Sequence, residues 1–432
     1  MGATVMDGDA GRNNAGRNRA GRRAALGLRL AWRNLWRNSK RSILTFSAVA
    51  FATGILVFMV ALQQGGYSAM IESAVSVFTG HIQVQARGYR DNPQLEKKLD
   101  QASILEERIA GIPGVQAVTA RAETYALVSS PSRTYGAAIV GVEPGHEPDF
   151  STIPKSVREG RFLKSPEGAE AVIGRTLAQN LSVSLGDELT LLGQGMDGAL
   201  AVVSTQVVGI FESGSPDIDR TMVEIPLKTF QDAFNMKNEA HAIVVRVTDL
   251  SRVESVAQKI AVSLKDQPRL SVLTWDQLLE GLKEGISLDA AIGWFLYAML
   301  VLVVTFSILN TFLMAVLERT REFGVLLALG ARAGFVGRTV MAESMLLLML
   351  GLAVGIALGA SICGITAHYG IAFTSSEELM AQWNMPVRIY PRLNFLSLFV
   401  GPLAVLIVTS IAAIFPILRV KHLRPVDAMR SA

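Results

Sequence analysis

The chain has 432 residues; half of them are hydrophobic, only 18% are charged, and the mean hydropathy is +0.35. A soluble chain of this length is usually less apolar, so membrane-spanning segments are expected. The net charge of +4 and the pI near 9.2 do not indicate a nucleic-acid partner, because the basic residues flank apolar runs and no nucleic-acid-binding motif accompanies them.

Residues 1–42 form a basic segment. They contain ten Lys and Arg residues but only two acidic ones, Asp7 and Asp9. Residues 63–286, in contrast, carry 21 Lys and Arg against 28 Asp and Glu, a net charge of −7. Because Lys and Arg beside membrane spans mark the cytoplasmic side, residues 1–42 are predicted to be cytoplasmic. The part up to Arg23 is predicted to be disordered.

The first apolar run, Ile43–Leu62, contains no ionisable residue and is long enough to span a membrane as a helix. It exceeds the roughly 7–15 apolar residues of a cleaved signal peptide, and no small-x-small cleavage site follows it. The run is therefore predicted to be a permanent membrane anchor.

Residues 63–289 form a large insert after this first span. Its beginning, Gln64–Val77, is predicted to continue the span as a helical stalk, and Trp275–Glu284 is predicted to return as the second half of that stalk. The expected strands are His81–Gln85 with a half-buried alternation, two strands within Val115–Val142 around a turn at Ser129–Pro131, the end of Leu181–Leu192, Val202–Phe211 and His241–Val247. The expected helices are Leu95–Ala110, Glu170–Asn180, Pro226–Phe234 and Ser251–Leu264. This mixture predicts an α+β extracytoplasmic domain of one or two subdomains.

Three further apolar runs follow: Ala290–Leu317, Ser344–Ala367 and Phe395–Leu418. Lys and Arg residues accumulate in 318–343 and 419–432 as well as in 1–42, so all three segments are predicted to be cytoplasmic and the loop 368–394 to lie outside. Aromatic residues mark the same interfaces: Trp32 and Trp36 on the inside, and Trp294, Tyr297, Trp383 and Tyr390 on the outside. The predicted fold class is a membrane α-helical protein with four transmembrane helices (1+3) and a large α+β domain between helices 1 and 2.

Enzymatic motifs are missing from the sequence. A Walker A loop requires the dipeptide Gly-Lys, which does not occur. The five histidines are scattered, and no H-E-x-x-H, C-x-x-C or G-x-S-x-G pattern is present. The chain is therefore predicted to be non-catalytic and to bind neither a cofactor nor a metal.

Isolated polar residues suggest function less strongly. Asp217 and Asp219 could form a metal or acid/base site with Glu212, but a solvated loop is the preferred interpretation. Glu343, at the start of the third span, is interpreted as an interfacial ion pair with Arg338 in preference to a functional intramembrane carboxylate. Cys363 is predicted to be a small packing residue. No span has an ionisable residue at its centre, which disfavours a proton-driven carrier.

The segment after the second span is the most informative. There an apolar helix passes into a charged turn and then into a short amphipathic stretch that ends at Gly330. The apolar positions are Phe323, Leu326, Leu327 and Leu329, and the residues predicted to face water or a partner are Arg319, Arg321 and Glu322. The pattern predicts a helix along the inner membrane surface. An ordinary interfacial connector between two spans fits the same pattern.

Two stretches of this segment, Glu318-Arg319-Thr320-Arg321-Glu322-Phe323-Gly324 and Leu327-Ala328-Leu329-Gly330-Ala331, resemble the coupling-helix signature of MacB/FtsX-type ABC transporter permeases, also called type VII or mechanotransmission transporters. Weaker similarities occur in the expected order at Ala31–Leu35, Leu185–Leu189 and Leu423–Met429. Within this family, the chain is most similar to the lipoprotein-releasing (Lol-type) permeases. The two features that it shares with them are the strand Thr79–Gln83 and the lack of a fused ATPase.

The resemblance implies several partners. They are a cytoplasmic ABC ATPase that holds ATP and Mg, a second permease copy or a paralogue in a dimer, the lipid bilayer, and a lipoprotein or a periplasmic chaperone or adaptor. The residues implied to couple to the ATPase are Glu318, Arg319, Thr320, Arg321, Glu322, Phe323, Gly324, Leu327, Leu329 and Gly330. The implied location is the bacterial inner membrane, with both termini cytoplasmic.

Three functions remain open within this resemblance. The first is the release of lipoproteins from the inner membrane. The second is the export of a periplasmic peptide, toxin or drug with an adaptor protein. The third is the regulation of a cell-wall hydrolase without transport. In each of them, the motion of the ATPase would reach the outer domain through the coupling segment.

Overall fold

The computed structural model describes residues 39–331, 333–372 and 388–415. Trp32, Trp36, Trp383 and the similarity at Leu423–Met429 lie outside the described residues, as does the end of the fourth predicted span. The chain divides into two compact units. The membrane unit contains residues 1–66, 288–371 and 389–432, and the inserted domain contains residues 67–287 with 372–388.

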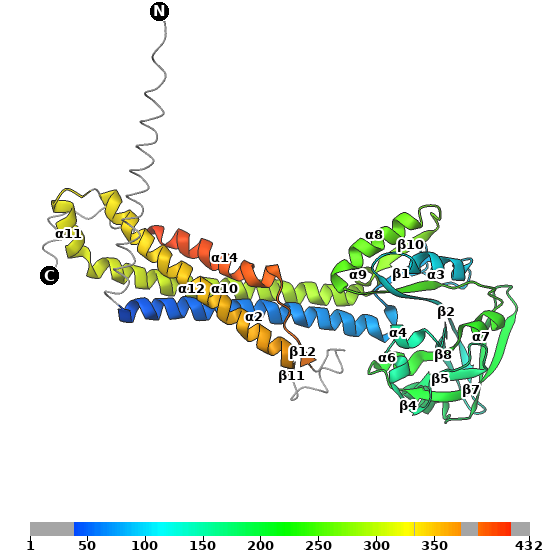
Figure 1. The fold of residues 1–432 in the computed structure, drawn as a ribbon. Coiled ribbons are helices and arrows are strands. Elements are labelled where there is room, and N and C mark those ends of the chain that lie inside the picture. Colours follow the sequence, from blue (N-terminus) through cyan, green and yellow to red (C-terminus); the bar gives the residue numbers. More distant parts are fainter. Residues whose placement is uncertain (1–38, 332, 373–387, 416–432) are drawn as a thin grey trace, which may run out of the picture. The chain divides into compact units, whose positions relative to one another are not determined.

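Four long apolar helices lie within the described residues (Figure 1). They are α2 (Ser39–Ala74), α10 (Glu280–Glu318), α12 (Ala333–Tyr369) and α14 (Phe395–Ala412). The prediction of one span, a large insert and three further spans is confirmed. Helix α10 has 39 residues, and at about 1.5 Å per residue it is longer than the roughly 30 Å hydrocarbon core. Helix α12 begins at Ala333, eleven residues before its apolar run begins at Ser344.

Helices α2 and α12 approach each other closely at three glycines. Gly351, Gly355 and Gly359 follow one face of α12 at four-residue intervals. A Cβ atom added at Gly355 would lie 2.6 Å from the backbone oxygen of Ala50 and 2.6 Å from the Cβ of Thr53. Small residues at this spacing are typical of membrane helices whose backbones pack side by side.

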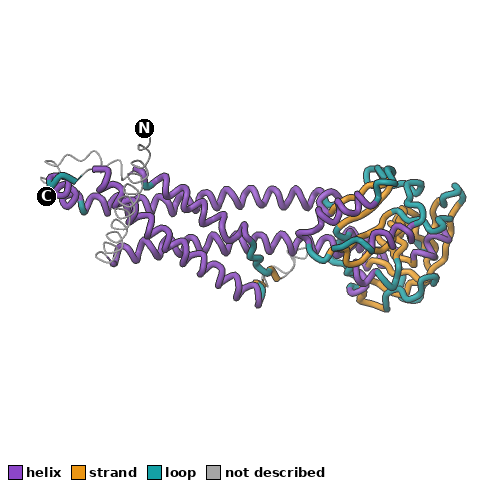
Figure 2. Tube along the Cα trace, turned by 45° about the horizontal axis from the view of Figure 1, so that its top comes forward, coloured by secondary structure: helices purple, strands orange, loops and turns teal. Residues whose placement is uncertain are grey.

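The inserted domain combines strands and helices (Figure 2). Its strands are β1 (Ile82–Ala86), β2 (Val115–Ser129), β3 (Thr134–Val142), β4 (Val157–Gly160), β5 (Glu170–Gly174), β6 (Glu188–Gln194), β7 (Leu200–Phe211), β8 (Met222–Pro226), β9 (Ala242–Val247) and β10 (Leu270–Thr274). Its helical segments are η1 (Val75–Thr79, π-helical), α3 (Ala102–Ala110), α4 (Glu147–Phe150), η2 (Ile153–Lys155), α5 (Arg175–Leu181), α6 (Pro216–Thr221), α7 (Leu227–Ala233), η3 (Leu250–Arg252), α8 (Val253–Ser263) and α9 (Trp275–Leu278). A short ladder of β11 (Ile371–Ala372) and β12 (Arg388–Ile389) lies apart from this sheet.

One mixed sheet with the order β10-β1-β9-β2-β3-β8-β5-β7-β4 organises the domain, and β6 pairs with β2 and β7. The long strand β2 joins two halves of the sheet: its residues 115–121 pair with β9, and its residues 122–129 pair with β3 and β6. A single cluster of buried apolar side chains extends across both halves. The described part of the insert is therefore one domain with a shared central strand, which confirms the predicted fold class.

Several predicted elements differ from the structure. Helix α3 begins only at Ala102, because Gln101 has a φ of 54° and Leu99 forms a β-bridge with Ala240. The predicted helix Glu170–Asn180 is wrong in its first half, where β5 inserts between β7 and β8 before α5 begins. Residues His81–Gln85 were expected to be half-buried, but both faces of β1 are buried: Ile82 and Val84 lie in the apolar core, and Gln83 and Gln85 on the opposite face are buried as well.

Candidate functional site

The segment after the second span forms a short helix, α11 (Thr320–Ala328), between α10 and α12 (Figure 1). Helix α10 ends at Glu318, and Arg319 has the non-helical angles φ −103° and ψ 13°. At the other end, the amide of Gly330 donates to the carbonyl of Leu327 at 3.1 Å, and Gly330 has a φ of +90°. Glycine adopts this left-handed conformation without strain, so it suits the end of the helix.

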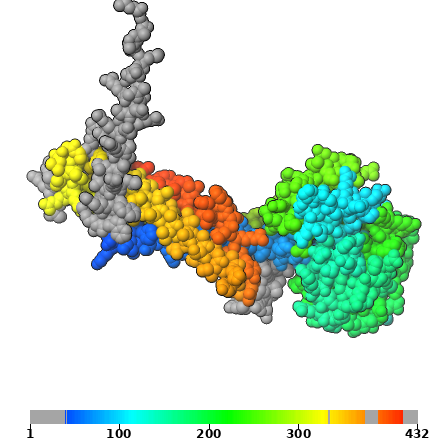
Figure 3. Space-filling view, in the orientation of Figure 1, coloured from blue at the N-terminus to red at the C-terminus, as the bar shows by residue number. Residues whose placement is uncertain are grey.

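Helix α11 has an inner and an outer face. Phe323 is buried in a small apolar cluster with Val316 of α10 and Val336 of α12. Val325 and Leu326 of α11 are exposed, as is Leu329 immediately after its end, which is 79% exposed. Figure 3 shows α11, in yellow, at the surface of the membrane unit. The helix is therefore anchored to two membrane helices while it presents apolar side chains outward.

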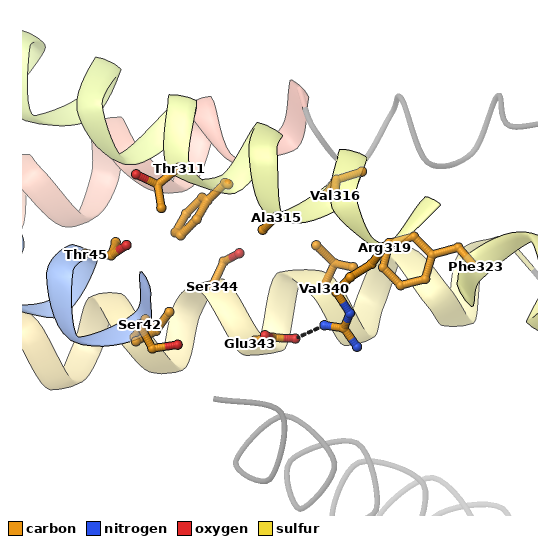
Figure 4. A pocket seen from close by; sticks show the side chains of 12 residues that line it. Ser42, Thr45, Thr311, Ala315, Val316, Arg319, Phe323, Val340, Glu343 and Ser344 are labelled. Carbon is orange, nitrogen blue, oxygen red and sulfur yellow. Dashed lines mark hydrogen bonds and ion pairs between the residues drawn. The ribbon is translucent and has the colours of Figure 1, made fainter. Parts of the chain in front are cut away.

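Arg319 points inward and joins α11 to α12 (Figure 4). Its guanidinium donates to Glu343 of α12 at 3.0 Å and to Glu322 of α11 at 3.1 Å. The carbon at the centre of the guanidinium lies 5.4 Å from the centre of the Phe323 ring. The Arg319 side chain is 17% exposed and that of Glu343 is 15% exposed. The pair is therefore largely buried at the junction of the three helices.

Two predictions about this segment are wrong in their details. Arg319 was expected to face water or a partner, but its ion pair with Glu343 turns it into the helix junction. Glu343 was expected to pair with Arg338, but the structure pairs it with Arg319 and leaves Arg338 exposed. The link between Arg319 and Glu343 spans 24 residues. No local sequence pattern could have revealed it.

The other predicted coupling residues divide between the two faces. Glu318, Arg321, Glu322, Leu329 and Gly330 are exposed, Gly324 is buried with Phe323, and Leu327 and Thr320 are half-buried. The Thr320 hydroxyl donates to the Val316 carbonyl at 3.1 Å. Beside Arg319, a cavity of about 30 Å³ is lined by Ser42, Thr45, Thr311, Glu343 and Ser344 (Figure 4). Such a volume suits a water molecule but no larger ligand.

The acidic residues near Glu212 do not form a solvated loop as predicted. Residues 216–221 form the helix α6, and Asp219 is buried, where it accepts hydrogen bonds from the amide and the hydroxyl of Ser213 at 2.8 and 2.7 Å. These contacts close the turn before α6. Among the described residues, no group of three His, Cys, Asp or Glu side chains is arranged to hold a metal ion.

A buried charge cluster in the inserted domain was not predicted. Arg121 of β2 forms a buried ion pair with Glu147 of α4, and Glu224 of β8 lies close to both. Neither carboxyl oxygen of Glu224 has a hydrogen-bond partner within the described part of the chain. Burial raises the pKa of Glu224 well above its ordinary value of 4.5, and the charge of Glu147 raises it further. With one arginine for two carboxyl groups, Glu224 is the one that keeps its proton.

We expect Glu224→Gln to stabilise the protein more at pH 8 than at pH 5. Unfolding exposes Glu224 and releases its proton at any pH above about 4.5, so the stability of the wild type falls as the pH rises from that value toward the raised pKa. Glutamine cannot ionise, so this fall disappears. The measurement is the midpoint of thermal unfolding of the purified full chain at the two pH values. An equal change at both would show that Glu224 is not protonated in the folded domain.

Comparison with known proteins agrees with this architecture. Residues 42–262 match the family model of the MacB-like periplasmic core domain, and residues 294–425 match that of the FtsX-like permease C-terminal domain. The chain is 22% identical to the lipoprotein-releasing system transmembrane protein LolE of Haemophilus influenzae and covers 98% of that protein with 93% of its own length. It is also 22% identical to LolC, the transmembrane protein of the same kind of system in Xylella fastidiosa, again over 98% of that protein and 94% of this chain. The pyoverdine export ATP-binding/permease protein PvdT of Pseudomonas fluorescens is 26% identical over 82% of this chain, but the matched part covers only 54% of PvdT.

Proposed function

This chain belongs to the family of MacB-like and FtsX-like ABC transporter permeases, and we propose that it passes the ATP-driven motion of a separate ATPase to its inserted domain through α11. In this proposal the chain is a non-catalytic subunit, and ATP and Mg bind to the partner ATPase. The chain is a multi-pass protein of the bacterial inner membrane. Both termini and α11 lie on the cytoplasmic side, as the Lys and Arg distribution predicts.

The geometry of α11 carries this proposal. Its inner face packs on α10 and α12, so a force on α11 acts on both helices. The outer face offers Val325, Leu326 and Leu329 to a partner. Apolar side chains exposed next to charged ones are typical of protein interaction sites. The exposed Arg321 and Glu322 would border this contact.

The proposed cargo is a lipoprotein that leaves the inner membrane. Support comes from LolE and LolC, which this chain matches over almost their entire lengths. Export with an adaptor protein is the second candidate. It is favoured by the similarity to PvdT, whose name describes pyoverdine export. Mass spectrometry of molecules that copurify with the nucleotide-free complex would separate the two, because lipoproteins are expected only in the first case.

We expect Leu329→Asp to weaken binding of the partner ATPase by about tenfold or more, since a charge placed in the apolar centre of an interface costs at least about 1.4 kcal/mol. The measurement is the amount of ATPase that copurifies with the permease and the ATP hydrolysis of the complex. Leu200→Asp is the matched control, because Leu200 of the inserted domain is 74% exposed and Leu329 is 79% exposed. Equal ATPase binding by the two variants would contradict a docking role for α11.

A further inference from the structure

The last turn of α2 is tied to the inserted domain by a polar cluster. Glu72 accepts hydrogen bonds from His81 at 3.1 Å and from Arg246 of β9 at 3.0 Å. The Nδ1 atom of His81 accepts a hydrogen bond from the backbone amide of Val247 at 3.2 Å. The ring therefore carries its proton on Nε2, and this N–H donates the hydrogen bond to Glu72. Arg246 also donates to the carbonyl of Asp149 at 2.6 Å. The hydrogen bond from His81 and the charge of Arg246 lower the pKa of Glu72, so Glu72 remains ionised.

The turn η1 that follows is held by further buried contacts. The carbonyl of Phe78 accepts a hydrogen bond from Arg121, whose guanidinium lies 4.3 Å from the centre of the Phe78 ring. The buried Glu147 neutralises Arg121. The carbonyl of Ser76 accepts the amide of Thr152 at 2.8 Å. The end of α2 and the turn η1 are therefore held in place by contacts with β2, with β9 and with the segment from α4 to η2.

Helix α10 is attached to the same domain differently. A single non-helical residue, Leu279 with φ −116° and ψ 62°, separates α9 from α10. The first turn of α10 forms an ion pair between Glu280 and Arg90 at 3.0 Å, and the Glu280 side chain is 66% exposed. A second pair joins the exposed Lys283 to the half-buried Asp276 at 2.9 Å. Exposed ion pairs add little to stability. The attachment of α2 also has an exposed member, Glu72, but it includes the buried His81 and the buried pair of Arg121 with Glu147, so the attachment of α10 can yield more easily.

We infer that Glu72, His81 and Arg246, together with Arg121, are positioning residues that make the inserted domain follow α2, whereas α10 tilts at Leu279. This inference rests on the proposed function, because it names the route by which motion enters the domain. A helix is stiff along its axis. A displacement of α2 can therefore move the inserted domain only if the last turn of α2 does not slip against that domain. The polar cluster and the buried Arg121 contacts prevent that slip.

The first test uses the isolated permease. Spin labels at Ser73 of α2 and at the exposed Lys155 report the distance across the attachment, after Cys363 is replaced by Ala. Glu72→Gln with Arg246→Met removes the α2 ion pair, and Glu280→Gln with Arg90→Met removes a pair of the same length, 3.0 Å, at α10. The distance distribution is expected to broaden only in the first double variant. Equal widths in both variants and the wild type would overturn the inference.

The second test uses the complex with its ATPase. Labels at Tyr369 and Lys155 measure whether ATP changes the position of the inserted domain. The ATP-dependent change in the label distance is expected to be severalfold smaller in the α2 double variant than in the wild type, at an unchanged rate of ATP hydrolysis. The α10 double variant is expected to show the full change. Arg246→Lys, which retains the charge, is expected to behave like the wild type and guards against simple misfolding.

The outcomes separate the two proposals. If the wild-type complex shows no ATP-dependent change, the proposed function fails, and the first test still decides whether the end of α2 is fixed. If the wild type responds and the α2 double variant responds equally, the proposed function stands and the inference is overturned. Equal losses in the α2 and α10 variants would also overturn it, because both attachments would then carry the motion.

Discussion

Arg319→Met is expected to destabilise the permease strongly and to release α11 from α12. The substitution leaves Glu343 buried without its cationic partner. Removing one member of a buried ion pair costs about 3–5 kcal/mol, and the slight exposure of this pair favours the lower value. The Phe323 ring also loses the guanidinium beside it. A clearly lower midpoint of thermal unfolding in detergent, with reduced ATPase binding, is the expected result.

Two further variants show whether the buried pair causes this loss. Glu322→Gln removes the exposed partner of Arg319, and exposed pairs contribute at most about 1 kcal/mol, so a small effect is expected. Arg319→Met with Glu343→Met removes both buried charges and is expected to recover most of the stability. If Arg319→Met costs no more than Glu322→Gln, the ion pair does not hold the junction together.

The arrangement of spans could be predicted because it follows from a single constraint. A helix needs about 20 apolar residues to cross a bilayer, and only four stretches meet that requirement. The boundaries were less accurate, since a helix can continue into polar sequence. Helix α12 starts at Ala333, before its apolar run. In the inserted domain, the predicted helix Glu170–Asn180 failed because pairing with β7 and β8 outweighs the local preference of residues 170–174.

In the candidate site, too, features that depend on neighbouring residues could be predicted, whereas contacts between residues far apart in the sequence could not. The existence of α11 could be predicted, because a charged turn, an amphipathic stretch and a terminal glycine are local signals. The direction of Arg319 could not, because its partner Glu343 lies on the next helix. The contact between Glu72 and Arg246 is even less accessible, with 174 residues between them. Contacts of this kind depend on packing and leave no periodic trace in one sequence.

Gly355→Leu is expected to separate α2 from α12 and to prevent stable assembly of the four helices. Even a Cβ atom at Gly355 would lie 2.6 Å from the Ala50 carbonyl oxygen, which belongs to the backbone and cannot rotate away. Gly355→Ala alone should therefore cost about 1–3 kcal/mol, the usual range for overpacking a tight contact, and leucine should cost more. The measurement is the midpoint of thermal unfolding in detergent, together with the yield of protein from the membrane.

Gly364 provides the matched control on the same helix. A Cβ atom at Gly364 has no neighbour within 4 Å, so only the helix propensity changes there. Gly364→Ala is expected to be neutral or to stabilise by up to about 1 kcal/mol. If Gly355→Ala and Gly364→Ala have the same effect, then α2 and α12 do not meet at this stripe.

The contact also involves α2, the helix whose far end is fixed to the inserted domain. A loosened stripe should therefore disturb that domain's response to ATP even in protein that still folds.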